Sequence, residues 1–138
     1  MPGPSEESRE PGGLRVAVGD RGPVRVVSVA GELDHDTADG LRAALAPPPS
    51  RDGIKRIVVD LTDLWFCDST GLNILLRARL DAQAVGLCLE LAGPRPLVAR
   101  LFAITGADDV LRVHPDLRTA LAASEDGPGS PAAPPGRA

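Results

Sequence analysis

A nearly unbroken apolar run, followed by an amphipathic repeat, is the feature that most restricts the fold of this chain. The run covers residues 54–61 and centres on Ile57, Val58 and Val59, as in a strand that is covered on both faces. Beyond it, leucines recur with the spacing of one helix face at Leu72, Leu75, Leu76 and Leu80. The pattern predicts a central strand of a parallel or mixed sheet, followed by a helix that ends near Gly86.

The segments on either side of this unit alternate between strand and helix patterns. Two runs rich in β-branched residues, 14–18 and 24–30, flank a turn sequence and predict a hairpin. The other predicted elements are a helix over 37–46 capped by Asp36, a strand over 87–91, a helix over 96–104, a strand over 110–113 and a helix over 115–123. Parallel strands need crossover connections of this length, so the alternation predicts an α/β fold.

A change of composition separates this pattern from the two ends of the chain. Residues 1–13 and 124–138 are rich in Pro, Gly, Ser and Ala and show no periodicity. Such segments cannot bury enough apolar surface to offset the entropy lost on ordering. We therefore expect two disordered tails and one domain over residues 14–123. The chain has 138 residues, the size of one ordinary domain, so its function must come from a single core and its loops.

Charge and composition argue against several classes of protein. The formal net charge is -4, whereas domains that bind nucleic acid carry a basic face. No segment reaches the roughly 20 apolar residues of a membrane span, and the N-terminus lacks the basic start and apolar stretch of a signal peptide. We therefore predict a cytoplasmic protein that contacts neither nucleic acid nor membrane.

Motifs for cofactors and metals are missing from the sequence. There is no Gly-x-x-x-x-Gly-Lys and no Gly-x-Gly-x-x-Gly pattern. The two cysteines, Cys67 and Cys88, form neither a metal-ligand spacing nor a disulfide framework. We expect no cofactor and no metal, and we interpret each cysteine as a small buried hydrophobe.

One hydroxyl residue at a helix start is the strongest candidate for function. In the sequence Asp68-Ser69-Thr70-Gly71-Leu72, Ser69 follows the buried strand where the next helix begins. Its oxygen could cap that helix by accepting a backbone N–H bond, which would be a purely structural role. Alternatively, the unpaired N–H groups of the first turn would tolerate a phosphate on Ser69. A phosphate adds roughly -1.5 to -2 charges and would repel an acidic or apolar partner.

Three segments give the chain a resemblance to a known family. They are Gly31-Glu32-Leu33-Asp34 after the second predicted strand, Asp68 to Leu72 after the third, and Arg100-Leu101-Phe102-Ala103-Ile104-Thr105-Gly106 near the third helix. In this order and on this background of strands and helices, the sequence resembles the STAS domain, and within it the anti-sigma-factor antagonists. The resemblance spans almost all of residues 14–123. It implies a single α/β domain with a mixed sheet of about five strands and helices packed largely on one face.

The resemblance also implies a function in partner switching. In such proteins the unphosphorylated form binds an anti-sigma factor and frees a sigma factor. The anti-sigma factor is itself a serine kinase that phosphorylates the antagonist and releases it, and a phosphatase resets the cycle. On this pattern Ser69 is the phosphoacceptor. Thr70 is a candidate because many relatives carry a serine there, but its β-branched side chain makes it the second choice. Asp34 and Asp68 would flank Ser69 in the docking surface, while Thr70, Gly71 and Leu72 would shape the helix start.

Other functions compete with this interpretation. A hydrolase would combine Ser69, His35 and Asp34 as nucleophile, base and orienter. However, Asp34 and His35 are neighbours in the sequence, and no Gly-x-Ser-x-Gly elbow is present. A glycosidase pair from Glu32 and Asp34 has equally little support, so we expect a binding protein and not an enzyme. The more serious alternative is a STAS scaffold or sensor subunit of a larger signalling complex.

Two residues with ring side chains, Trp65 and His114, lie outside these motifs. Trp65, the single tryptophan, lies at the end of the third predicted strand and is interpreted as a core or rim side chain, not a binding anchor. His114 precedes Pro115 near a helix start and is interpreted as an exposed loop residue. The Pro47–Pro49 segment ends the first predicted helix and suggests no function.

Overall fold

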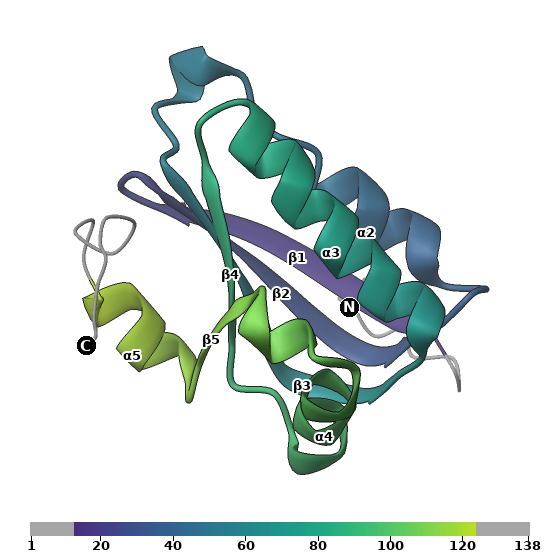
Figure 1. Cartoon of the computed structure of the whole chain (residues 1–138). Coiled ribbons are helices and arrows are strands. Elements are labelled where there is room, and N and C mark those ends of the chain that lie inside the picture. The colour runs from purple at the N-terminus through teal and green to yellow at the C-terminus, as the bar shows by residue number, and fades with distance from the viewer. Residues whose placement is uncertain (1–12, 124–138) are drawn as a thin grey trace, which may run out of the picture.

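The computed structural model describes residues 13–123, in which five strands form one mixed sheet in the order β1-β2-β3-β4-β5 (Figure 1). β1 (Leu14–Arg21) and β2 (Val24–Leu33) form the predicted antiparallel hairpin. β3 (Arg56–Cys67), β4 (Cys88–Ala92) and β5 (Arg112–His114) each run parallel to the strand before them. β3 is therefore central, as its apolar run predicts. The two predicted tails, apart from Gly13, lie outside the described residues.

Helices connect the parallel strands and lie mainly on one face of the sheet. α2 (Ala38–Ala44) links β2 to β3, α3 (Ser69–Ala84) links β3 to β4, and α4 (Pro96–Thr105) links β4 to β5. Short 3-10 turns, η1 (Ser50–Asp52) and η2 (Ala107–Asp109), precede β3 and β5, and α5 (Leu117–Ala122) follows β5. α2 and α3 contact each other across the same face (Figure 1). The predicted α/β fold class is confirmed.

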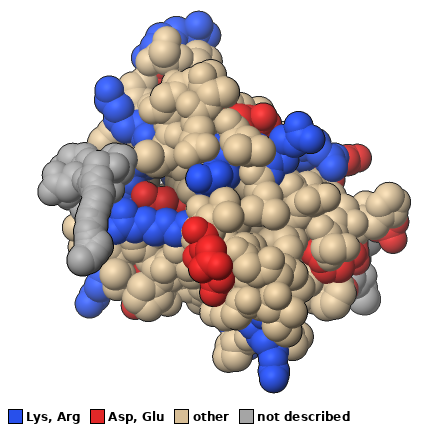
Figure 2. All heavy atoms as spheres, in the orientation of Figure 1, with Lys and Arg blue, Asp and Glu red and all other residues tan. Residues whose placement is uncertain are grey.

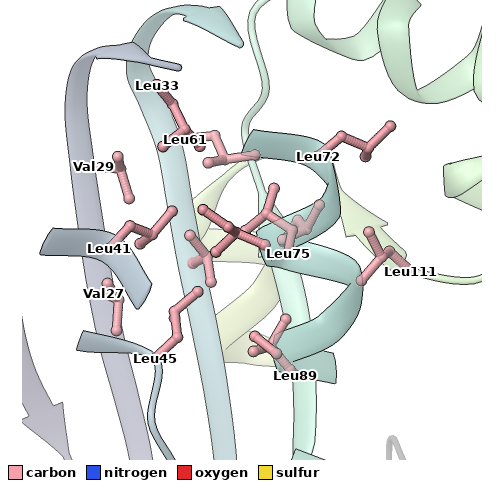
Figure 3. Close-up of a cluster of buried hydrophobic side chains, with 14 of the residues drawn as sticks. Val27, Val29, Leu33, Leu41, Leu45, Leu61, Leu72, Leu75, Leu89 and Leu111 are labelled. Carbon is pink, nitrogen blue, oxygen red and sulfur yellow. The ribbon is translucent and has the colours of Figure 1, made fainter. Parts of the chain in front are cut away.

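The main core lies between this face of the sheet and the helices α2, α3 and α4. Successive side chains of a strand point to opposite faces, so Val27 and Val29 of β2 enter the core. Figure 3 shows Leu75 of α3 in the middle of the cluster, among side chains from β2, α2 and β4. Leu41 and Leu75 are completely buried, and burial of each such side chain contributes about 1.5–3 kcal/mol. Leu72 and Leu75 of the predicted helix face therefore anchor α3 to the sheet, together with Ile74, Ala78 and Ala82. The prediction is wrong for Leu80, which is 55% exposed, and Leu76 is only partly buried.

The end of β3 differs from the prediction and positions the loop that follows it. The apolar run ends at Leu61, but β3 continues to pair with β2 as far as Cys67, through register shifts between Ser28 and Ala30 and between Gly31 and Glu32. Extra residues of this kind bend a strand and change the face to which its side chains point. The extension brings the end of β3 level with the end of β2.

A buried polar cluster lies on the opposite face of the sheet, beneath α5. Arg56, Glu90 and His114 are only 3%, 4% and 5% exposed. One terminal nitrogen of Arg56, Nη2, donates to Glu90 Oε1 at 2.6 Å and to the Ala120 carbonyl of α5 at 2.9 Å. His114 Nε2 lies 2.9 Å from the same Glu90 oxygen. Arg56 thus ties the sheet to α5 through both a carboxylate and a helix carbonyl.

Two conclusions follow from this cluster. The interpretation of His114 as an exposed loop residue is wrong, because His114 ends β5 and its ring is buried against Glu90. Burial alone would raise the pKa of Glu90, but hydrogen bonds with His114 and Arg56 outweigh it and lower the pKa below its ordinary value. Glu90 is therefore a buried carboxylate with partners.

Candidate functional site

The loops that follow β2 and β3 meet at one end of the sheet. Because these strands are parallel neighbours with Leu33 opposite Cys67, their carboxyl ends lie at the same edge. The backbone N–H of Asp68 donates to the Leu33 carbonyl at 3.2 Å and joins the two loops. Asp34 and Asp68, the first residues beyond the two strands, are thus brought to the same end of the molecule as Ser69.

Asp68, and not Ser69, caps helix α3. The Asp68 carboxylate accepts a hydrogen bond from the Gly71 N–H at 3.1 Å, and the Asp68 carbonyl accepts one from Leu72 N at 3.0 Å. Ser69 is the first residue of the helix and is exposed. Within residues 13–123 its hydroxyl makes no hydrogen bond. The capping interpretation of Ser69 is therefore wrong, and the local fold does not depend on this hydroxyl.

Gly71 lets α3 begin close against the ends of β2 and β3. A Cβ atom at this position would lie 2.6 Å from Leu33 Cγ and 2.9 Å from Cys67 Sγ. The next residue, Leu72, is 6% exposed and belongs to the main core. The close packing at Gly71 and the burial of Leu72 fix the inner side of the first turn, while Ser69 lies on the exposed side of the same turn. Thr70 is partly buried and lines an open groove between α2 and α3.

Asp34 holds the loop that leads into α2. Its Oδ1 accepts hydrogen bonds from the backbone N–H groups of Asp36 and Thr37, at 2.9 and 3.1 Å. The Thr37 hydroxyl donates to the Glu32 carbonyl at 2.8 Å, and Thr37 is the residue that precedes α2. The prediction of Asp36 as the cap of this helix is wrong, because Thr37 occupies the cap position and no side chain in the described part of the chain caps the first turn of α2. An Asx-type turn of this kind is a common local use of aspartate.

The hydrolase arrangement requires an aspartate that orients the histidine ring. In the part of the chain that the structure describes, the Asp34 carboxylate contacts backbone N–H groups and the Thr37 hydroxyl, and no hydrogen bond joins it to His35. His35 itself is exposed on the loop. The three residues therefore lie at one end of the molecule without forming the hydrogen-bonded chain that nucleophilic catalysis requires.

Two aromatic side chains near the end of β3 are exposed. Trp65 is 61% exposed and Phe66 is 42% exposed. The guanidinium carbon of Arg95, in the loop before α4, lies 4.3 Å from the centre of the Trp65 ring. Trp65 is therefore not a core side chain. The contact between Arg95 and Trp65 was not predicted from the sequence, because the two residues are 30 positions apart and only the folded sheet brings them together.

Within residues 13–123, the cysteines and acidic groups offer no metal centre. Cys67 and Cys88 are both partly buried, and neither is as enclosed as predicted. Burial, and then the adjacent charge of Asp68, raise the pKa of the Cys67 thiol to about 12, so the thiol stays protonated and weakly reactive. Among the described residues, no group of three or more His, Cys, Asp or Glu side chains is arranged to hold a metal ion. None of the described helices is long and apolar enough to cross a membrane.

Comparison with known proteins gives relatives that are named anti-sigma factor antagonists. The anti-sigma-B factor antagonist of Listeria monocytogenes is 34% identical over 87 residues, which are 63% of this chain and 75% of that protein. The crystal structure of an anti-sigma factor antagonist from Mycobacterium paratuberculosis is 30% identical with a TM-score of 0.72, and the match covers 83% of this chain and 96% of that one.

A more distant structure shares the fold. SpoIIAA of Bacillus, an anti-sigma factor antagonist solved in its unphosphorylated form, is 22% identical with a TM-score of 0.59, and the match covers 72% of this chain and 87% of that one. The same protein has also been solved in a phosphorylated form. At this identity the likeness concerns the fold alone.

The family comparison covers nearly the whole described domain. The family described as "Mlab, STAS domain" matches residues 16–115, which include β2, β3 and β4, the loops between them and the start of α3. Together with the relatives above and the five-stranded mixed sheet, this match confirms the resemblance seen in the sequence, and the chain belongs to the STAS domain family.

Proposed function

We propose that this chain is an anti-sigma-factor antagonist whose binding to an anti-sigma factor with serine kinase activity is switched by phosphorylation of Ser69. Its relatives are named as antagonists of this kind. The observation that carries the proposal is the start of α3, where Asp68 provides the cap and leaves Ser69 exposed with an unbonded hydroxyl. A kinase can reach such a hydroxyl without unfolding the helix.

The surroundings of Ser69 support a switch based on charge. A phosphate on the first residue of α3 would lie at the positive end of the helix dipole, where anions are tolerated. It would also add roughly -1.5 to -2 charges to an end of the sheet that already carries Asp68, Asp34 and Asp36. Surface that suits a neutral serine would then repel acidic groups of the partner. SpoIIAA has both an unphosphorylated and a phosphorylated form, which fits a cycle of this kind.

The predicted partner-binding residues divide into two groups by their burial. Gly71 and Leu72 are buried, so we assign them to holding the helix start. Asp34, Asp68 and Thr70 are partly exposed and are available to the partner, with Thr70 as the second choice of phosphoacceptor. In this proposal the protein acts in the cytoplasm, a phosphatase restores Ser69, and the chain itself is not an enzyme and contacts neither nucleic acid nor membrane.

Phosphorylation by purified anti-sigma-factor kinases tests the site. The chain is incubated with each kinase and ATP, and the phosphate is located by mass spectrometry. We expect one phosphate on the wild type, none on Ser69→Ala, and normal incorporation on the control Thr70→Val. Incorporation that persists in Ser69→Ala and disappears in Thr70→Val would transfer the role to Thr70.

Binding tests the switch. Ser69→Asp adds one negative charge at the start of α3, whereas Ser50→Asp adds the same charge at an exposed serine near the opposite end of β3. We expect weaker binding to the anti-sigma factor for Ser69→Asp only, although one carboxylate imitates a phosphate incompletely. Equal affinity of both variants would refute release by charge. Turnover of generic ester substrates that is lost in Ser69→Ala would instead establish a hydrolase.

A further inference from the structure

We infer that Trp65, held in place by Arg95, is the binding anchor for the partner, and that the partner receives it in an apolar pocket bordered by carboxylates. The inference rests on the proposed function, because the partner is taken to be the anti-sigma factor. It adds a second contact region beside the Ser69 loop, and it names the chemistry of the partner's surface.

The position of the Trp65 ring has no explanation in the folding of the domain. The side chain is 61% exposed, although tryptophan is on average well buried. Its ring is nevertheless held, because the Arg95 guanidinium lies over it at 4.3 Å and also donates from Nη1 to the Thr62 carbonyl at 3.4 Å. A side chain that is ordered before binding loses less entropy on binding, and exposed tryptophans of this kind dominate many interfaces.

Helix α4 continues this surface with apolar and basic residues. Leu97 and Ile104 are 63% and 74% exposed, and their spacing of seven positions places them on the same side of the helix. Arg100 is exposed between them. Residues 93–106 contain two arginines and no carboxylate, and Figure 2 shows mostly uncharged surface over α4 in the lower part of the view.

The charge of this surface indicates the partner. Arg95 and Arg100 favour carboxylates on the opposing surface, and the leucine and isoleucine favour an apolar floor between them. A partner with these features would also be sensitive to a phosphate on Ser69, since negative charge would then face negative charge. Trp65 lies four positions before Ser69 along the chain, and Arg95 contacts the Trp65 ring, so one partner can cover both. The expected response to the Ser69 phosphate therefore favours the anti-sigma factor over a second copy of this chain. The net charge of -4 of a second copy belongs to the chain as a whole and does not identify a surface that would fit this one.

The single tryptophan of the chain provides a direct test. The chain is labelled with 5-fluorotryptophan, which gives one fluorine NMR signal, from position 65. Unlabelled anti-sigma factor, the one that phosphorylates Ser69, is then added. We expect the signal to shift and to lose its sensitivity to exchange of H2O for D2O. In binding measurements, Trp65→Ala should weaken affinity at least tenfold and Arg95→Ala severalfold, while Val85→Ala should match the wild type.

Val85 is a matched control, because its side chain is 59% exposed and lies just beyond the opposite end of α3. Two results would refute the anchor and leave the proposed function intact. The first is that Trp65→Ala binds the partner as tightly as the wild type does. The second is that the fluorine signal does not change when the partner binds, although Ser69→Asp weakens the same complex. Failure of the unmodified chain to bind any anti-sigma factor would refute the proposed function and the anchor with it. A fluorine shift that depends on the concentration of this chain alone would assign the surface to a second copy.

Discussion

The close contact beneath Gly71 gives a prediction whose size can be worked out from the structure. In Gly71→Ala the added Cβ would meet Leu33 Cγ at 2.6 Å, Leu33 Cδ2 at 2.8 Å and Cys67 Sγ at 2.9 Å. Leu33 is completely buried, so it has little room to move. Overpacking of this kind costs about 1–3 kcal/mol, and alanine returns about 0.5–1 kcal/mol through its better helix propensity. We expect a net loss of up to about 2.5 kcal/mol in the free energy of unfolding.

Gly40→Ala is the matched control for this substitution. Gly40 lies within α2, and a Cβ there would have no atom within 4 Å. Alanine at this position should therefore stabilise the protein by about 0.4–1 kcal/mol. Urea unfolding measures both variants, because a change of midpoint at constant slope reports a change of stability. The two substitutions should shift the midpoint in opposite directions.

A double substitution tests the contact itself. The substitution Cys67→Ala removes the sulfur atom of one of the two side chains that crowd position 71. The cost of Gly71→Ala should then be smaller than in the wild type, since the two residues share the same space. If Gly71→Ala is as stable as Gly40→Ala, the start of α3 is not held by close packing and the reasoning is refuted.

Other predictions concern the helix cap and the buried cluster. Asp68→Ala should lower the free energy of unfolding by about 1 kcal/mol because the α3 cap is lost, whereas Ser69→Ala should change it by less than about 0.5 kcal/mol; equal effects in urea unfolding would contradict the assignment of the cap. The pKa of Glu90 is lowered in the folded protein from an ordinary value of 4.5, so its contribution is present above that pH and is lost as the pH falls through the lowered pKa. The stability difference between wild type and Glu90→Gln should therefore shrink in acid, and a difference that stays constant with pH would show that the pKa is not lowered. Arg56→Met should cost about 3–5 kcal/mol because it leaves a buried carboxylate short of a partner, while Arg25→Met, at a more exposed ion pair, should cost less than about 1 kcal/mol; similar thermal unfolding of the two variants would contradict the burial of the cluster.

The fold could be predicted from the sequence where the local pattern of apolar residues decides the structure. Ile57, Val58 and Val59 are each at most 1% exposed, and a run without alternation can occur only in a strand that is covered on both sides. His114 shows where this reasoning fails. A histidine before a proline resembles a loop residue, and its burial depends on Glu90, 24 positions earlier, and on a helix that comes after it. No local pattern contains that information.

The position of the candidate loop at the start of α3 could be predicted from the sequence, but its hydrogen bonds could not. Asp68 and Ser69 are both good capping residues, so the sequence cannot decide which of them precedes the helix. The choice follows from the register of β3 on β2, which sets Cys67 opposite Leu33, and from the approach at Gly71. The Trp65–Arg95 contact is likewise a product of strand pairing. Both features depend on residues that are distant in the sequence.

The use of Asp68 as the cap would allow the proposed switch to work without a change of fold. Because the cap and the buried contacts of Leu72 hold the first turn, a phosphate on Ser69 would change the charge of the surface and not its packing. Two unit charges 4 Å apart in water interact by about 1 kcal/mol, so a phosphate of roughly two charges opposes each nearby carboxylate of a partner by about 2 kcal/mol. Since about 1.4 kcal/mol corresponds to a tenfold change in affinity, two such carboxylates would reduce binding by nearly a thousandfold. In the proposed switch, release would therefore need only a few acidic groups facing Ser69, and the same acidic character that Arg95 would attract would make the partner responsive to the phosphate.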